Sequence, residues 1–166
     1  MAFYSFFSFF LLSMLISSTK EMLEFGNQLA KNNKVLLLSG ELGAGKTVLT
    51  KGFAKGLGIN FSHVTSPTYA YVNIYDGKLL HIDMYRINIF DELIEKGIID
   101  LIQEYEYIVI ERPKFKEKLG LKNYVDINIK KISDKKRTIE IGKATKDSKV
   151  SKASKLKKPQ GLKASK

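Results

Sequence analysis

The spacing of apolar residues changes several times along this chain, and each spacing predicts a different element. After Ser18, apolar positions recur every three or four residues, which predicts a helix from Thr19 to about Lys31 that opens with the capping-box sequence Ser-Thr-Lys-Glu. The continuous apolar run at 35–39 predicts a buried strand, and the stretch at 46–57 is typical of a helix closed by glycine. The first part of the chain therefore reads as helix, strand and helix.

The later part of the chain is richer in short apolar runs and in alternating apolar and polar positions, both of which predict strands. Asp76-Gly77 lies between two such runs and is a strong hairpin signal. A second antiparallel pair is expected further on, and a buried strand is expected to end at Glu111. The expected strands are 69–75, 78–83, 107–110, 125–132 and 138–141, and the expected helical segments are 91–95 and 98–103.

A glycine-rich octapeptide, Gly-Glu-Leu-Gly-Ala-Gly-Lys-Thr at 40–47, joins the first predicted strand to the second predicted helix. It matches the phosphate-binding (Walker A) pattern G-x-x-x-x-G-K-[ST], in which backbone N–H groups surround a phosphate at a helix N-terminus. Lys46 then supplies charge to the β- and γ-phosphates, and the Thr47 hydroxyl is placed to ligate Mg²⁺. The residues expected to bind the nucleotide at this loop are Gly43, Ala44, Gly45, Lys46, Thr47 and Val48.

The strand before this loop and the strand that ends at Glu111 are expected to be parallel and central in one sheet. Ligands of such sheets bind at the carboxyl ends of the strands, so the loop at 40–47 and Glu111 are expected at the same edge. The sequence therefore predicts an α/β fold. Its sheet is P-loop NTPase-like, with parallel central strands, antiparallel hairpin additions and helices on both faces.

Two carboxylates are candidates for holding the metal and orienting the attacking water. Glu111 ends an apolar strand as a Walker B carboxylate does, and we expect it to bind Mg²⁺ together with Thr47. Asp83, at the end of the hairpin, is the second candidate, and the division of roles between the two acids stays open. Lys46, Asp83 and Glu111 are thus the expected catalytic residues. Thr68 lies in a loop where GTPases have switch I, a position from which a hydroxyl can sense the γ-phosphate.

Composition and charge change this picture mainly at the C-terminal end. Of the net charge of +11, eight positive charges lie in residues 143–166, which hold nine lysines, one aspartate and no aromatic residue. Such a segment buries too little apolar surface to offset its ordering entropy, so we predict a disordered tail that either contacts RNA weakly or aids solubility. The absence of cysteine excludes disulfides and thiolate metal sites.

The other end, residues 1–14, is apolar and rich in phenylalanine, like the core of a signal peptide. No lysine or arginine precedes the apolar run, and it is short for a membrane-spanning helix, so we expect a cytoplasmic protein without stable membrane insertion. Translation from Met14, or a short strand that begins near Leu15, accounts for this leader. The expected domains are the leader at 1–14, a P-loop ATPase domain at 15–142 and the tail at 143–166.

Several motifs in fixed order make the sequence more specific than its phosphate loop alone. After the loop come Thr65-Ser66-Pro67-Thr68-Tyr69, then His81-Ile82-Asp83-Met84-Tyr85-Arg86, then Glu111 with Pro113 two residues on. In this combination the chain, from about Ser18 to Ile141, closely resembles the TsaE (YjeE) family, small bacterial ATPases required to make the threonylcarbamoyladenosine modification of tRNA.

The resemblance implies ATP and Mg²⁺ as cofactors, slow ATP hydrolysis, and work with the TsaD and TsaB proteins, through which tRNA is reached indirectly. By position it also implies that Thr47 and Glu111 hold the magnesium and that Ser18 and Thr19 approach the nucleotide base. Many relatives have tryptophan after the strand-end glutamate, where this chain has Arg112.

Two other functions stay open on the residues alone. A small-molecule kinase would use the same phosphate loop, but the three arginines of the chain do not form a lid-like cluster in the sequence. A nucleotide-dependent RNA-binding or membrane-associated module would act through the basic tail or the apolar leader. No Asn-Lys-x-Asp motif follows the Glu111 strand, which favours ATP over GTP.

Overall fold

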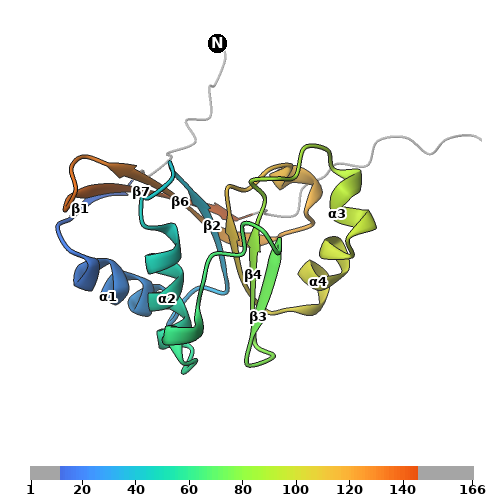
Figure 1. The fold of residues 1–166 in the computed structure, drawn as a ribbon, viewed down its shortest axis with the longest axis horizontal. Helices are drawn as coiled ribbons and strands as arrows, with labels where there is room; N and C mark the ends of the chain where they lie inside the picture. The colour runs from blue at the N-terminus through green and yellow to red at the C-terminus, as the bar shows by residue number, and fades with distance from the viewer. Residues whose placement is uncertain (1–11, 146–166) are drawn as a thin grey trace, which may run out of the picture.

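The computed structural model describes residues 12–145, and Figure 1 shows their arrangement. Most of the predicted leader and nearly all of the predicted disordered tail lie outside the described residues. Within residues 12–145, no helix is long and apolar enough to cross a membrane.

A seven-stranded mixed sheet runs through the molecule in the order β1-β7-β6-β2-β5-β4-β3. The four central strands β6, β2, β5 and β4 are parallel to one another, whereas β1, β7 and β3 are antiparallel additions at the two sides. The predicted mixed sheet with parallel central strands is confirmed. The strands are β1 (Leu12–Ile16), β2 (Val35–Ser39), β3 (Val72–Tyr75), β4 (Leu79–Asp83), β5 (Tyr107–Glu111), β6 (Asn123–Lys131) and β7 (Arg137–Thr145).

Helices cover both faces of the sheet, and they fall in two pairs (Figure 1). Alternate residues of β2 point to opposite faces: Leu36 and Leu38 belong to the core beneath α1 and α2, and Leu37 belongs to the core beneath α3 and α4. All three are fully buried, as expected for a central parallel strand. The helices are α1 (Thr19–Leu29), α2 (Lys46–Gly56), α3 (Asp91–Glu95) and α4 (Ile98–Glu104), with short 3₁₀ turns η1 (Phe61–His63) and η2 (Lys116–Lys118).

Two glycines allow α1 and α2 to touch backbone to backbone. A Cβ atom at Gly26 would lie 2.3 Å from the Leu49 carbonyl oxygen, and one at Gly52 would lie 2.1 Å from the Leu23 carbonyl oxygen. Neither gap admits a side chain, so glycine is required at both positions. This contact fixes α1 against α2, the helix that carries the phosphate loop.

Of the element boundaries that differ from the predictions, three have a clear structural cause. The predicted strand at 69–75 begins only at Val72, because Tyr71 has a left-handed φ of 66° and its N–H donates to the Pro67 carbonyl (2.7 Å) in a turn. Strand β1 begins at Leu12 rather than near Leu15, pairing with β7 from Leu12 onward. Strand β7 continues to Thr145, four residues past the predicted end, because its added residues pair with the start of β6.

Candidate active site

The phosphate loop connects the carboxyl end of β2 to the N-terminus of α2, as predicted. Gly40 has φ 139° and packs so closely that a Cβ atom there would lie 2.4 Å from the Ile129 carbonyl oxygen of β6. Gly45 is left-handed (φ 111°) at the position that caps α2. Both conformations are open to glycine and strained for other residues, which explains the glycine pattern of the loop.

Lys46 is 4% exposed, and its ammonium group donates to two carbonyls of its own loop, those of Gly40 (2.9 Å) and Glu41 (2.8 Å). Burial lowers the pKa of Lys46 from its ordinary value, and the nearby Glu111 carboxylate opposes this shift. The cation therefore lies over the loop, in position to exchange a carbonyl for a phosphate oxygen.

Glu111, at the end of β5, is 1% exposed and accepts two hydrogen bonds on one oxygen. Thr47 Oγ1 lies 3.1 Å and His81 Nε2 lies 3.0 Å from Glu111 Oε1. Burial alone would raise the pKa of Glu111, but the hydrogen bond and charge of His81, the Lys46 charge and the Thr47 hydroxyl together hold it below its ordinary value. The two residues expected to hold Mg²⁺, Thr47 and Glu111, are thus in direct contact.

His81 is a site residue that the sequence analysis quoted only as part of a motif. It lies two residues before Asp83 on β4, so both side chains project from the same face of the strand, and Asp83 is paired in register with Glu111 of β5. The spacing His-x-Asp at the end of a strand was the signal that could have identified it.

Asp83 has a separate set of partners. Its carboxylate accepts from the Thr68 hydroxyl (2.7 Å) and from the Tyr85 N–H (2.9 Å), and Arg112 Nη2 lies 3.4 Å from it. The Arg112 guanidinium in turn lies 4.5 Å from the centroid of the Tyr85 ring. The two candidate acids are therefore held differently: Glu111 contacts the phosphate-loop helix, and Asp83 holds the loop that contains Thr68.

A cavity of about 450 Å³ adjoins the phosphate loop on the side away from Glu111's strand. Thr19 lines it together with Gly43, Gly45 and Val48, so four of the predicted nucleotide-binding residues share one space. Its size lies in the usual range for small-molecule sites. Two further lining residues, Lys135 and Arg137 from the turn and strand after β6, were not predicted.

Arg137 joins this turn to the phosphate loop. Its Nε donates to the Ala44 carbonyl (3.2 Å), its Nη2 to the Gly43 carbonyl (3.4 Å), and its Nη1 to the Asp134 carbonyl (2.7 Å). No local sequence signal could have found it, because about ninety residues separate it from the loop and only the strand order brings them together.

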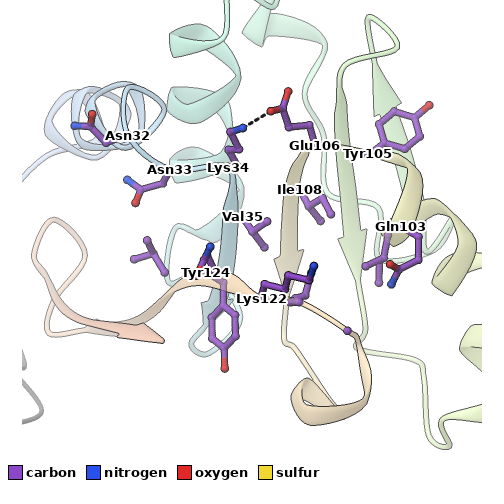
Figure 2. A pocket seen from close by; sticks show the side chains of 15 residues that line it. Asn32, Asn33, Lys34, Val35, Gln103, Tyr105, Glu106, Ile108, Lys122 and Tyr124 are labelled. Carbon is purple, nitrogen blue, oxygen red and sulfur yellow. Dashed lines mark hydrogen bonds and ion pairs between the residues drawn. The ribbon is translucent and has the colours of Figure 1, made fainter. Parts of the chain in front are cut away.

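A second cavity, of about 500 Å³, lies at the opposite end of the central strands (Figure 2). It is lined by Val35, the first residue of β2, and by Ile108, the second residue of β5. At its edge, Lys34 forms an ion pair with Glu106. None of the predicted site residues lines this cavity, so it is distinct from the space beside the phosphate loop.

The side chains present fit a magnesium ion that a nucleotide brings with it. Among the described residues no group of three or more His, Asp or Glu side chains could hold a metal on its own. Thr47 and Glu111 offer a hydroxyl and a carboxylate side by side, and Mg²⁺ in nucleotide sites takes only one or two protein ligands and completes its shell with phosphate and water.

Comparisons with known proteins agree with one another. The sequence profile described as "Threonylcarbamoyl adenosine biosynthesis protein TsaE" matches residues 16–139. The chain is similar to the tRNA threonylcarbamoyladenosine biosynthesis protein TsaE of Bacillus subtilis, with 36% identity over 124 residues that cover 73% of this chain and 77% of the relative. It is also similar to the TsaE protein of Borreliella burgdorferi, with 38% identity over 104 residues that cover 58% of this chain and 74% of the relative.

The fold agrees with the sequence. The structure resembles the crystal structure of YdiB from Bacillus subtilis with a TM-score of 0.59 and 28% identity, over 81% of this chain and 86% of that one. The family profile spans the phosphate loop, the Thr68 loop, the His-x-Asp strand and the Glu111 strand. The chain therefore belongs to the TsaE family of threonylcarbamoyladenosine biosynthesis proteins.

Proposed function

We propose that this protein binds ATP with Mg²⁺ and hydrolyses ATP slowly in the synthesis of threonylcarbamoyladenosine in tRNA, where it acts with the TsaD and TsaB proteins. The observation that carries the proposal is the contact of Thr47 with Glu111 at 3.1 Å, beside a complete Walker A loop. It brings the two magnesium ligands expected of such a site into one position. The cytoplasm, where ATP is abundant, is the proposed place of action.

The chemistry of the chain follows from these contacts. Backbone N–H groups of residues 43–46 and the Lys46 ammonium would bind the phosphates. A phosphate oxygen would then replace the Gly40 and Glu41 carbonyls as the acceptor for the Lys46 ammonium. Glu111 stays ionised because its pKa lies below the ordinary value, so it can hold the metal or orient water. Bound Mg²⁺ would neutralise charge that develops on the transferred phosphoryl group.

The cavity beside the phosphate loop is the proposed place of the nucleoside. Thr19 and Val48 would lie against it, and Lys135 and Arg137 would close it from the β6–β7 turn. The Arg137 guanidinium already donates to two carbonyls of the loop, which stabilises the loop from behind. A hydrolase that works slowly alone fits this arrangement, since no arginine has a hydrogen bond or ion pair with Lys46, Thr47 or Glu111 within residues 12–145.

The kinase alternative is less well supported. Kinases use several arginines in a mobile lid, whereas here Arg112 is paired with Asp83 and Arg137 with the back of the phosphate loop. The RNA-binding alternative depends on the tail, which lies outside the described residues. Neither alternative accounts for the family membership of the chain.

Two measurements test the proposal. In cells depleted of the protein, mass analysis of tRNA nucleosides should show loss of threonylcarbamoyladenosine, which wild-type protein restores and Lys46→Ala does not. By calorimetry, Lys46→Ala should weaken ATP binding by about 10- to 100-fold, the size expected for a lost charged hydrogen bond. Lys51→Ala, further along α2, serves as the charge-matched control. Unchanged tRNA modification after depletion, or equal ATP affinity for Lys46→Ala and wild type, would contradict the proposal.

A further inference from the structure

His81 is a buried polar residue whose surroundings do not explain it as a core residue. It is 0% exposed, and Leu79, which projects from the same face of β4, is equally buried and apolar. Its Nδ1 has no hydrogen-bond partner among the described residues. A buried nitrogen left without a partner is destabilising, so an apolar residue would serve the core better. Within residues 12–145, the one hydrogen bond of the imidazole is that with Glu111.

That contact determines which oxygen of Glu111 is in use. A carboxylate accepts and cannot donate, so His81 Nε2 carries the proton in this pair. Both His81 and Thr47 donate to Oε1, and no hydrogen bond within residues 12–145 uses Oε2. His81 therefore fixes the carboxylate in one orientation and leaves its second oxygen for a metal ion or a water.

Tyr75, on the neighbouring strand β3, packs beside His81 on the side away from Glu111. Its ring centroid lies 6.1 Å from that of His81 at an interplanar angle of 40°, within the range of favourable aromatic pairs. Its hydroxyl donates to the Thr65 carbonyl (2.9 Å) and accepts from the Thr65 N–H (3.2 Å). One buried phenol thus binds both backbone groups of an exposed loop residue, as a paired strand would.

The loop at 65–68 is consequently held at both ends by the β3–β4 hairpin. Tyr75 holds the backbone of Thr65, and Asp83 accepts from the hydroxyl of Thr68. His81, on β4, lies between Tyr75 of β3 and Asp83 of β4, and it contacts the Glu111 carboxylate. A chain of direct contacts therefore runs from Thr65 through Tyr75 and His81 to Glu111.

We propose that Tyr75 and His81 are positioning residues that couple the loop at 65–68 to the orientation of Glu111. This inference rests on the proposed binding of magnesium nucleotide. If Glu111 holds a metal ion, the contacts through His81 and Tyr75 keep the Thr65 backbone in place. Conversely, a loop that moves away from Tyr75 leaves His81 less able to fix the orientation of the Glu111 carboxylate. Binding at the phosphate loop and order in the 65–68 loop then reinforce each other.

The first test removes the tyrosine hydroxyl and keeps its ring. Tyr75→Phe should increase hydrogen exchange at the Thr65 amide about tenfold, and should weaken ATP binding in the presence of Mg²⁺ roughly three- to tenfold, the size expected for one lost hydrogen bond. ATP binding in excess EDTA should not change. Tyr107→Phe is the matched control, since the Tyr107 hydroxyl makes no hydrogen bond among residues 12–145.

The second test replaces the imidazole. His81→Gln keeps a nitrogen donor at about the distance of Nε2 and should retain Mg²⁺-dependent affinity, whereas His81→Leu, which packs like its neighbours but cannot donate, should lose it. In wild type, ¹⁵N NMR should show a protonated His81 Nε2, and Glu111→Gln should shift that resonance.

The outcomes separate this inference from the proposed function. If wild type fails to bind magnesium nucleotide, the proposed function fails. If wild type binds it, and Tyr75→Phe and His81→Leu match wild type both in Mg²⁺ dependence and in Thr65 exchange, the coupling is overturned. If His81→Leu does not fold, Tyr75→Phe alone decides the question.

Discussion

Arg112 Nη2 lies 3.4 Å from Asp83 Oδ2, across the adjoining ends of β5 and β4. Arg112 is 18% exposed in its side chain and Asp83 is fully buried there, so this ion pair is shielded from solvent more than a surface pair. The Arg112 backbone is left-handed (φ 52°), and its N–H donates to the Leu38 carbonyl at 2.8 Å. Arg112 thus compensates the charge of Asp83 and also lies over the ring of Tyr85.

Removing this cation should destabilise the fold. Arg112→Ala leaves the buried Asp83 carboxylate with the Thr68 hydroxyl and the Tyr85 N–H as its remaining partners, and we expect the free energy of unfolding to fall by about 1–3 kcal/mol. Denaturant unfolding measures it. Arg112→Trp, which keeps an aromatic-stacking surface and removes the charge, separates the two contributions. The interpretation fails if Arg112→Ala is as destabilising in an Asp83→Asn background as in wild type.

Thr47 offers a test of the magnesium assignment. Thr47→Ala should impair ATP binding in the presence of Mg²⁺ and leave binding in EDTA nearly intact, because only the metal-directed hydroxyl is lost. Thr47→Ser keeps the hydroxyl and is the control. Calorimetric titrations with and without Mg²⁺ measure both. Equal losses with and without the metal would show that Thr47 acts on the phosphate or on the loop instead.

Glu111 should make stability depend on pH in a defined direction. Its pKa in the folded protein lies below the ordinary value of 4.5, so the folded state holds the ionised form to lower pH than the unfolded chain does. This contribution is fully present above about pH 4.5 and is lost as the pH falls through the folded-state pKa. Glu111→Gln should therefore reduce the loss of stability on acidification, as measured by denaturant unfolding between neutral and acidic pH.

The same variant tests the role of Glu111 in hydrolysis. Glu111→Gln keeps the shape of the side chain and should retain ATP binding in EDTA, but Mg²⁺-dependent affinity and phosphate release should both be strongly reduced because the charge is gone. Asp83→Asn should have the milder effect, since Asp83 contacts the Thr68 loop rather than the phosphate-loop helix. If Asp83→Asn abolishes hydrolysis and Glu111→Gln does not, the two roles must be exchanged.

The helix contact beneath the phosphate loop gives a prediction on stability. Gly52→Ala would bring a Cβ atom to 2.1 Å from the Leu23 carbonyl oxygen, so α1 and α2 must separate. We expect a loss of about 1–3 kcal/mol in the free energy of unfolding. Lys55→Ala, on the exposed side of the same helix, should change it by less than about 0.5 kcal/mol. Equal thermal midpoints for Gly52→Ala and wild type would show that the helices are not held at this distance.

Local patterns predicted most of this fold, because each strand and helix carries its own spacing of apolar residues. The phosphate loop and the strand-end acids could be identified for the same reason, because each is recognised from residues adjacent in the sequence. The bond from His81 to Glu111 and the contacts of Arg137 with the phosphate loop depend on strand order, which no local pattern encodes. Tyr71 is not a strand residue because the turn from Pro67 gives it a left-handed φ, which overrides its β propensity.

The last prediction concerns activation by partner proteins. Of the three arginines, Arg112 is paired with Asp83 and Arg137 with the phosphate loop, whereas Arg86 is exposed and has no acidic partner within residues 12–145. Its guanidinium lies 5.9 Å from the ring centroids of both Tyr69 and Tyr71, beside the loop that contains Thr68. Arg86 is therefore the arginine that the proposed TsaD and TsaB partners could redirect at the smallest cost.

We expect slow phosphate release by the protein alone and faster release with the TsaD–TsaB complex. An arginine ordered beside the γ-phosphate can raise the rate of hydrolysis on the order of 10³-fold. Arg86→Ala should remove most of the acceleration while leaving the basal rate and ATP affinity close to wild type, because Arg86 makes no hydrogen bond or ion pair with residues 40–47. Arg112→Ala, by contrast, should lower stability and leave part of the acceleration intact. Steady-state phosphate release with and without the partners measures each case. A fast basal rate that the partners do not change would mean that the site is complete without them, and full acceleration of Arg86→Ala would exclude this arginine as its source.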